Sequence, residues 1–157
     1  VEVYAKSSSS IRKFEVEDSL NISVEFANGA VGNIFASDTT PSPWSYEANT
    51  HENKHYYPTD ENCYYFFGTS GSLGFPKMEL WNYTISSKSG WQHPLNISYE
   101  IPPETDPLLS QLDHFCDVIK GKQKPITSCL DGKKSLSVVL SVIESIDKKI
   151  PVQIKLS

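Results

Sequence analysis

The feature that most constrains the fold is a hairpin pattern between Leu20 and Ala36. Apolar and polar side chains alternate over the first half of this stretch, which is typical of a strand with one buried face: Leu20, Ile22, Val24 and Phe26. Asn28-Gly29 follows, a dipeptide that tolerates the two positive φ angles of a tight turn. Ala30–Ala36 is therefore predicted to return as the partner strand.

The register of this hairpin depends on the length of its turn. With a two-residue turn, Val24 lies opposite Asn33 and Ile22 lies opposite Phe35. That register places the amide side chain of Asn33 on an otherwise apolar face. A register shifted by one residue fits the sequence equally well. Both alternatives stay open at this point.

Further short segments rich in β-branched and aromatic residues predict the remaining strands: Val1–Lys6, Cys63–Phe67, Ser72–Phe75, Lys77–Tyr83, Trp91–Ile101 and Val152–Leu156. Their connections are mostly short, and the glycines of Gly68–Gly71 indicate a turn, so the strands are expected to pair mainly antiparallel. A chain that starts directly on a strand is also expected to be part of something longer.

The apolar pattern changes to helical spacing after these strands. Asp106 is the predicted N-cap of a helix with Pro107 at its first position, and Gly121 is expected to end it. A second helix is predicted from near Asp131 to Lys149, with these residues facing inward: Leu136, Val139, Leu140, Ile143 and Ile146. Strands followed by helices indicate an α+β domain, with a largely antiparallel open-faced sheet of about six or seven strands and two C-terminal helices packed on one face. Residues 1–157 are expected to form a single domain.

Composition argues against several classes of partner. The 14 basic and 19 acidic residues give a formal net charge of −5, and no basic cluster is present to bind nucleic acid. No apolar run approaches the length needed to cross a membrane. Cys63, Cys116 and Cys129 are odd in number and lack CxxC spacing, so we interpret them as reduced, mostly buried thiols of a cytoplasmic protein.

The segment Asp38–Glu61 has no periodicity and collects aromatic and histidine side chains: Trp44, Tyr46, His51, His55, Tyr56 and Tyr57. A loop this long is usually functional or disordered. Hydrogen-bonding aromatic rings suit the faces and hydroxyls of a sugar or polyol, although they suit a protein partner or ordinary loop packing as well.

Within that loop, residues 51–55 match the HExxH pattern of zinc hydrolases, with His51 and His55 as ligands and Glu52 as general base. The motif requires an amphipathic helix, and the flanking residues lack an apolar stripe. Zinc hydrolysis is therefore kept as an alternative, and no metal site is assigned. His114, next to Asp113, is interpreted as a histidine on a helix surface because adjacent helical residues point in different directions.

Four segments in this order resemble the C-terminal domain of the Gfo/Idh/MocA oxidoreductases, the family of glucose–fructose oxidoreductase and inositol dehydrogenase: Ser23–Gly32, Phe67–Leu73, Phe115–Pro125 and Asp131–Ser145. The resemblance extends from about Val1 to Leu156. It implies an open sheet that packs helices on one side and supports dimerisation and a substrate cleft on the other. It also implies hydride transfer between NAD or NADP and a sugar, polyol or related alcohol.

In that family the Gly-rich nucleotide loop and the Glu-Lys-Pro lysine belong to an N-terminal Rossmann domain, and the Asp/His catalytic motif lies just before the first strand of this chain. None of these motifs is matched here, so we expect no catalytic or cofactor-binding residue and no turnover by this chain alone. The resemblance places the aromatic loop at the substrate cleft, which makes Trp44, Tyr46, His51 and His55 the predicted substrate-binding residues. The expected partners are the Rossmann domain, a second copy of the chain and a sugar or polyol. A non-catalytic module for ligand binding or dimerisation remains a further alternative.

Overall fold

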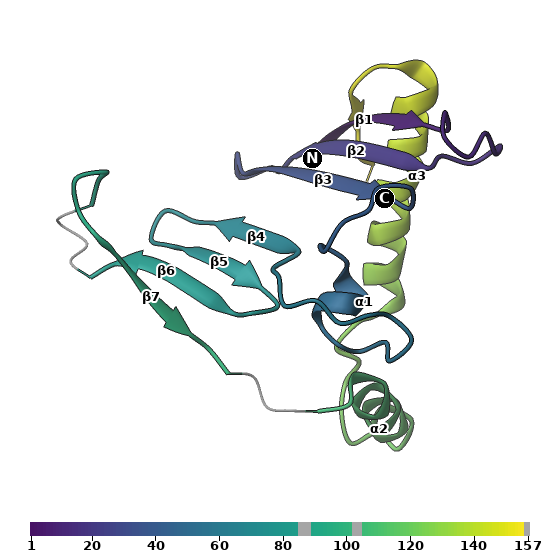
Figure 1. The fold of residues 1–157 in the computed structure, drawn as a ribbon. Helices are drawn as coiled ribbons and strands as arrows, with labels where there is room; N and C mark the ends of the chain where they lie inside the picture. The colour runs from purple at the N-terminus through teal and green to yellow at the C-terminus, as the bar shows by residue number, and fades with distance from the viewer. Residues whose placement is uncertain (85–88, 102–104, 156–157) are drawn as a thin grey trace. The chain divides into compact units, whose positions relative to one another are not determined.

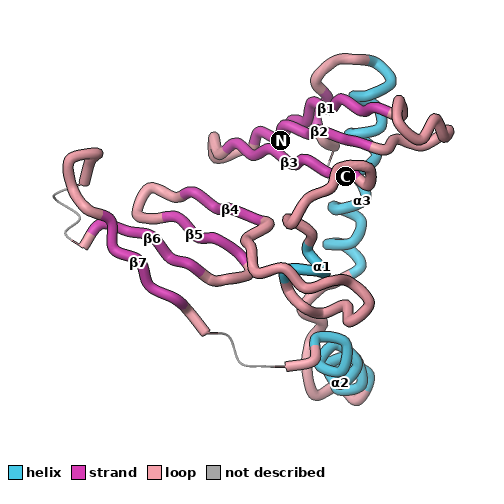
Figure 2. The backbone as a smooth tube through the Cα atoms, viewed as in Figure 1, coloured by secondary structure: helices cyan, strands magenta, loops and turns pink. Residues whose placement is uncertain are grey.

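The computed structural model describes residues 1–84, 89–101 and 105–155. This part of the chain contains eight strands in two open four-stranded antiparallel sheets, together with helices, so the predicted α+β class is confirmed for it. Figures 1 and 2 show the course of the strands and helices. The strands form two sheets and not the single sheet expected. The chain divides into two compact units, Val1–Thr40 with the segment from His114 onward, and Pro41–Asp113.

The first unit is a sheet covered by one long helix. Its strands are β1 (Glu2–Ser8), β2 (Ser19–Glu25), β3 (Val31–Ser37) and β8 (Val152–Gln153), in the order β3-β2-β1-β8. The helix α3 (Cys129–Lys148) lies along β1. The core consists of one face of β1, the middle of α3 and the last strand region: Val3, Ala5, Val142 and Ile154. Leu156, the predicted end of the last strand, lies outside the described residues.

The predicted β2–β3 hairpin is confirmed, and of the two alternatives for its turn the two-residue one is not found. The loop has three residues between Phe26 and Ala30, because the Phe26 N–H donates to the Ala30 carbonyl at 2.8 Å. Only Gly29 takes a positive φ, 83°. This is a three-residue hairpin loop with its glycine in the left-handed region.

The extra loop residue shifts the pairing by one position. Ile22 lies opposite Ile34 and Ser23 opposite Asn33, so the slipped register is the correct one. The Ser23 hydroxyl donates to the Asn33 side-chain oxygen at 2.8 Å. Asn33, which the two-residue turn would have placed on the apolar face, therefore lies on the polar face and pairs with Ser23.

The N-terminus of α3 is fixed by a capping box. The Ser128 hydroxyl accepts from the Asp131 N–H at 3.3 Å, and the Asp131 carboxylate accepts from the Ser128 N–H at 3.0 Å. The helix therefore begins at Cys129, slightly before the predicted start near Asp131. Hydrogen bonds from the Ser128 side chain and backbone, and then the charge of Lys134, lower the pKa of Asp131 below its ordinary value.

This cap predicts acid sensitivity of α3. Because the pKa of Asp131 is lowered by folding, its contribution to stability is present above the unfolded pKa of about 4 and is lost as the pH falls through the folded value. We expect the helix signal at 222 nm to show less acid-induced destabilisation in Asp131→Asn than in the wild type below about pH 4. Glu15→Gln, whose residue lies on an exposed loop, is the matched control and should not alter the pH dependence of helix stability.

The predicted inward face of α3 is mostly wrong. Leu136, Val139, Leu140 and Ile143 are exposed, and of the predicted set only Ile146 packs against the core. The buried positions are Ser141, Val142 and Ser145. Small serines let the helix approach β1 closely, and Ser145 adds specific bonds: its hydroxyl accepts from the Ala5 N–H at 3.0 Å and donates to the Ile150 carbonyl at 2.7 Å.

The second unit contains the sheet β4 (Tyr64–Phe67), β5 (Ser72–Phe75), β6 (Glu79–Tyr83) and β7 (Leu95–Tyr99), paired in chain order, and the short helix α1 (Tyr46–Asn49). Asn62 is buried against this sheet. Its amide donates to Glu79 at 2.8 Å, and its side-chain oxygen accepts from the Lys77 N–H at 3.0 Å. Gly74 makes room for this side chain, since a Cβ there would meet Asn62 Nδ2 at 2.5 Å.

The remaining helix, α2 (Pro107–Ile119), has the predicted caps. Asp106 accepts from the N–H groups of Leu108 and Leu109 at 2.9 and 3.1 Å, and Gly121 follows the helix with a φ of 71°. His114 on this helix is partly exposed, as interpreted from the sequence. Its Nε2 accepts from the Ile126 N–H at 3.2 Å, which secures the segment that follows.

The three cysteines are free thiols, but the expectation that they are mostly buried is wrong. Cys63 and Cys116 are half-buried and Cys129 is exposed at the start of α3. Burial raises the pKa of the Cys63 thiol. Within residues 1–84, 89–101 and 105–155, no helix has the length and apolar character required to traverse a bilayer.

Candidate functional site

The aromatic loop of the second unit is held in shape by a buried amide. Asn49, at the end of α1, is only 6% exposed, and its Nδ2 donates to the Pro43 carbonyl at 2.9 Å and to the Thr59 hydroxyl at 2.8 Å. The Thr59 hydroxyl in turn donates to Pro43 at 2.8 Å. Asn49 therefore ties the start of the loop to its end. A single asparagine in a polar loop gives no sequence signal for this role.

Tyr46 is the most constrained of the predicted substrate-binding residues. Its ring lies 6.2 Å from Tyr64 and 6.1 Å from Phe75, and its hydroxyl donates to Glu52 Oε1 at 3.1 Å. Burial, and then the hydrogen bond to Glu52 and its charge, raise the pKa of Tyr46. The phenol therefore remains protonated at neutral pH, with its proton directed at a carboxylate.

The Tyr46–Glu52 pair offers a clear set of hydrogen-bonding functions. The phenol oxygen and the carboxylate both accept, so two ligand hydroxyls can donate to neighbouring oxygens. The sequence indicates Glu52 only as part of the HExxH pattern, and it carries no signal for the hydrogen bond from Tyr46. Acceptors next to an aromatic ring are suited to a polyhydroxylated ligand.

The structure does not bring the other predicted residues against Tyr46, whose partners are Glu52, Tyr64 and Phe75. Trp44 is 65% exposed, and its backbone N–H donates to Ser42. His51 and His55 are exposed on the same loop. These three side chains are free to meet a ligand, but they do not form a preassembled cluster with Tyr46.

The zinc-hydrolase alternative is not supported by the backbone of residues 51–55. His51 and His55 would need to share one face of a helix, whereas this segment is not helical and His51 has a φ of 59°. Among the residues that the structure describes, no group of three or more His, Cys, Asp and Glu side chains is arranged to hold a metal ion.

The glycine-rich segment between β4 and β5 is a hairpin turn, as predicted. The Gly68 N–H donates to the Gly71 carbonyl at 2.8 Å, and the chain continues into β5. A dinucleotide cradle places such glycines before a helix whose N-terminal N–H groups face the pyrophosphate. This turn does not have that arrangement.

Comparison with known protein families identifies one domain over almost the whole chain. Residues 1–154 match a family described as an oxidoreductase family, C-terminal alpha/beta domain. A search of curated proteins finds no significant match.

Several solved structures share the fold. An NAD-binding protein from Listeria innocua has a TM-score of 0.68 and 18% identity, and the alignment covers 97% of this chain and 40% of that one. Levoglucosan dehydrogenase in complex with NADH and levoglucosan has a TM-score of 0.64, 18% identity and coverages of 98% and 44%. Aldose-aldose oxidoreductase from Caulobacter crescentus, complexed with glycerol, has a TM-score of 0.63, 21% identity and coverages of 98% and 41%. The chain thus spans less than half the length of these relatives.

Proposed function

Because the chain belongs to the Gfo/Idh/MocA oxidoreductase family, as its C-terminal α/β domain, we propose that it is the substrate-binding and dimerisation domain of an NAD(P)-dependent oxidoreductase acting on a sugar, a polyol or a related alcohol. The observation that carries the proposal is the family match over residues 1–154, which includes both compact units. The similar structures bound to NADH with levoglucosan, and to glycerol, favour a polyhydroxylated substrate.

The aromatic loop is the proposed substrate-binding surface. Tyr46 and Glu52 accept hydrogen bonds from substrate hydroxyls, and exposed Trp44 offers a ring face for the C–H side of a sugar. His51 and His55 supply further donors or acceptors from the same loop. Asn49 holds the loop in shape without contacting the substrate.

We assign nucleotide binding and hydride transfer to a Rossmann domain outside this chain. This assignment is supported by the glycine-rich turn of the described residues, which leads from β4 into β5 and not into a helix, and so lacks the arrangement of a dinucleotide cradle. In this proposal the chain binds and orients the substrate. The isolated chain is expected to be inactive with either NAD or NADP.

A second copy of the chain is the proposed partner of an exposed sheet face. Strand register places Tyr65, Phe67, Trp81 and Tyr99 on the same face of the second sheet. Phe67 is 82% exposed and stacks on Tyr65 at 6.5 Å. Several exposed aromatic side chains on one sheet face are a feature of protein interfaces, which supports this proposal.

The substrate site is tested by ligand-observed NMR of the 157-residue chain with levoglucosan, glycerol and myo-inositol. We expect at least one of these polyols to bind, and Tyr46→Phe to weaken that binding about tenfold, because the variant loses the hydroxyl that pairs with Glu52 while keeping the ring. Tyr57→Phe is the control, since Tyr57 is 87% exposed on the same loop.

Two results would contradict this assignment. If none of the three polyols binds, the loop is not a polyol site in this chain. If Tyr46→Phe and Tyr57→Phe bind the same ligand equally well, the bound polyol does not use the Tyr46–Glu52 pair.

A further inference from the structure

The aromatic loop places one carboxylate beside a group of three rings. Tyr64 of β4 and Phe75 of β5 are direct partners in the strand register, and their ring centroids lie 5.9 Å apart. The Tyr46 ring lies 6.2 and 6.1 Å from them, and its hydroxyl donates to Glu52 Oε1 at 3.1 Å. Tyr46 and Tyr64 remain 38% and 47% exposed. A ligand that lies against these rings therefore meets the Glu52 carboxylate next to the Tyr46 hydroxyl.

The charge of Glu52 is not neutralised by an ion pair within the part of the chain that the structure describes. The ion pairs there include neither Glu52 nor Lys54, which lies two positions along the loop. The hydrogen bond from Tyr46 reaches Oε1, so Oε2 can still accept from a ligand hydroxyl. Two other carboxylates of the loop are engaged differently: Glu47 accepts from the Ser45 hydroxyl at 3.3 Å, and Asp60 pairs with Lys77 at 3.9 Å.

The loop as a whole has an acidic balance. Residues 41–61 carry one lysine and four carboxylates: Glu47, Glu52, Asp60 and Glu61. With the histidines neutral, their formal net charge is −3. Like charges brought together at a binding site cost free energy, and this cost increases as water is excluded. An anionic group on a ligand would thus be repelled by Glu52 and, more weakly, by the rest of the loop.

We propose that Glu52 is a specificity residue, and that the loop binds an uncharged sugar or polyol and rejects the corresponding acid or phosphate ester. A substrate hydroxyl can donate to the carboxylate, whereas an ionised acid has no proton to donate and adds a like charge. This inference rests on the proposed function, because it names the substrate class of the same site.

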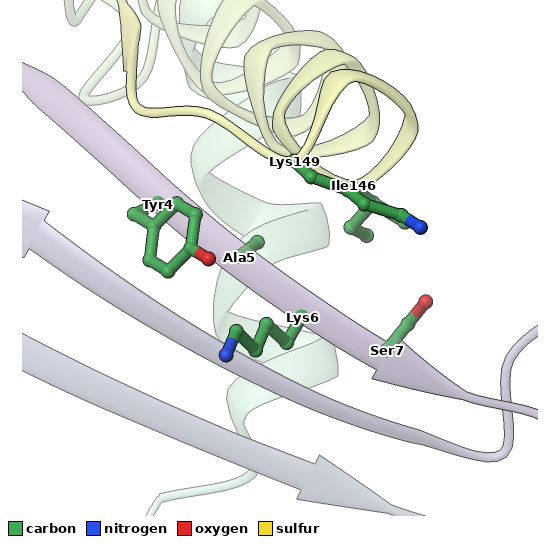
Figure 3. A pocket seen from close by; sticks show the side chains of 6 residues that line it. All are labelled: Tyr4, Ala5, Lys6, Ser7, Ile146 and Lys149. Atoms are coloured by element: carbon green, nitrogen blue, oxygen red, sulfur yellow. The ribbon is translucent and has the colours of Figure 1, made fainter.

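A recess in the first unit does not bring charged groups together in this way. It has a volume of about 470 Å³ between β1 and the end of α3, and Tyr4, Lys6 and Lys149 are among its lining residues (Figure 3). Successive residues of a strand point to opposite faces, so Tyr4 and Lys6 lie on the face of β1 opposite to Ala5, which is buried against α3. Lys6 and Lys149 therefore do not converge on one ligand. The amides of the aromatic loop are the ones to monitor when charged and uncharged polyols are compared.

The experiment compares matched ligands in titrations of the ¹⁵N-labelled 157-residue chain, with ionic strength held constant by sodium chloride. The pairs are glucose with glucuronate, glycerol with glycerate, and myo-inositol with myo-inositol 1-phosphate. In at least one pair we expect the neutral polyol to shift the amides of Tyr46 and Glu52. Its charged counterpart is expected to bind about tenfold more weakly, because it meets an unpaired carboxylate.

Two variants test the assignment to Glu52. Glu52→Gln removes the charge and keeps a side-chain oxygen that can accept from Tyr46, so the ratio of the two dissociation constants should fall from about ten to about one. Glu61→Gln is the matched control and should keep the ratio, because Glu61 is exposed at the end of the same loop and the Tyr46 hydroxyl bonds to Glu52.

The outcomes separate this inference from the proposed function. A charged ligand that binds as tightly as its neutral counterpart, or a difference that persists in Glu52→Gln, would overturn the inference and leave the proposed polyol site intact. Loss of the difference in Glu61→Gln as well would overturn the assignment to Glu52 in favour of the general charge of the loop. If no neutral polyol shifts these amides, the proposed site fails, and the inference fails with it.

Discussion

Gly71→Ala is expected to destabilise the second unit by about 3 kcal/mol. A Cβ at this position would lie 2.6 Å from the Trp81 carbonyl oxygen and 3.4 Å from Asn82 Cβ. The closest group is backbone in β6, so it cannot rotate away as the end of a side chain would. Either the turn at Gly68–Gly71 or the β6 strand has to move, and both are held by the pairing of β5 with β6.

Tryptophan fluorescence provides a selective measurement of this effect. Trp44, Trp81 and Trp91 all lie within Pro41–Asp113, so fluorescence-detected urea unfolding monitors the second unit. The midpoint should fall in Gly71→Ala with the slope unchanged. An unchanged midpoint would show that the backbone between β5 and β6 yields more easily than the 2.6 Å approach implies.

Gly132→Ala is the matched control for a methyl group added to glycine. Gly132 lies in α3, and a Cβ there meets nothing within 4 Å. Alanine in a helix interior is favoured over glycine by up to about 1 kcal/mol, so this variant should stabilise the helix signal at 222 nm. The fluorescence transition of the second unit should stay in place.

Local patterns were sufficient to predict most of the secondary structure. The alternation from Leu20 to Phe26 predicted β2, and Asp106 with Pro107 marked the start of α2. These signals are local, because a strand face and a helix cap depend on residues only a few positions apart. The family resemblance was carried by several such elements in a fixed order.

Features that depend on distant contacts were predicted less well. Two apolar stripes compete on α3, and the one richer in large side chains, containing Leu136 and Ile143, was predicted to face inward. The sheet selects the other stripe, because Ser141 and Ser145 allow β1 to approach and Ser145 bonds to Ala5. The buried stripe of α3 is thus decided by contacts such as that of Ser145 with Ala5, which lies 140 positions away in the sequence.

The candidate site shows the same limit. Residue type and loop length singled out Tyr46, but its hydrogen bond to Glu52 and its stacking on Phe75 require the folded loop. Asn49 organises this loop through its buried amide. The sequence alone does not distinguish a buried asparagine from an exposed one. The pairing of Tyr46 with Glu52 is therefore a property of the folded loop, which composition does not encode.

Ser145→Ala is expected to destabilise the first unit by about 3 kcal/mol. Ser145 is fully buried, and its hydroxyl satisfies two backbone groups at once, the Ala5 N–H of β1 and the Ile150 carbonyl that precedes β8. Alanine leaves both groups buried without this partner, and each such group costs about 1–3 kcal/mol. Amide exchange at Ala5 measures the loss directly and should become much faster relative to the wild type.

Ser141→Ala separates the loss of these bonds from the loss of a buried hydroxyl in general. Ser141 lies one turn earlier on the same face and is 8% exposed, but its hydroxyl donates only to the Ser137 carbonyl of its own helix. That bond is local, and alanine is the better helix former, so this variant should change stability by less than about 0.5 kcal/mol. Equal destabilisation by the two variants would mean that close packing of small side chains, and not the link from α3 to β1, holds the first unit together. A large effect of Ser145→Ala alone would identify that link as the contact that sets the position of β1 against α3.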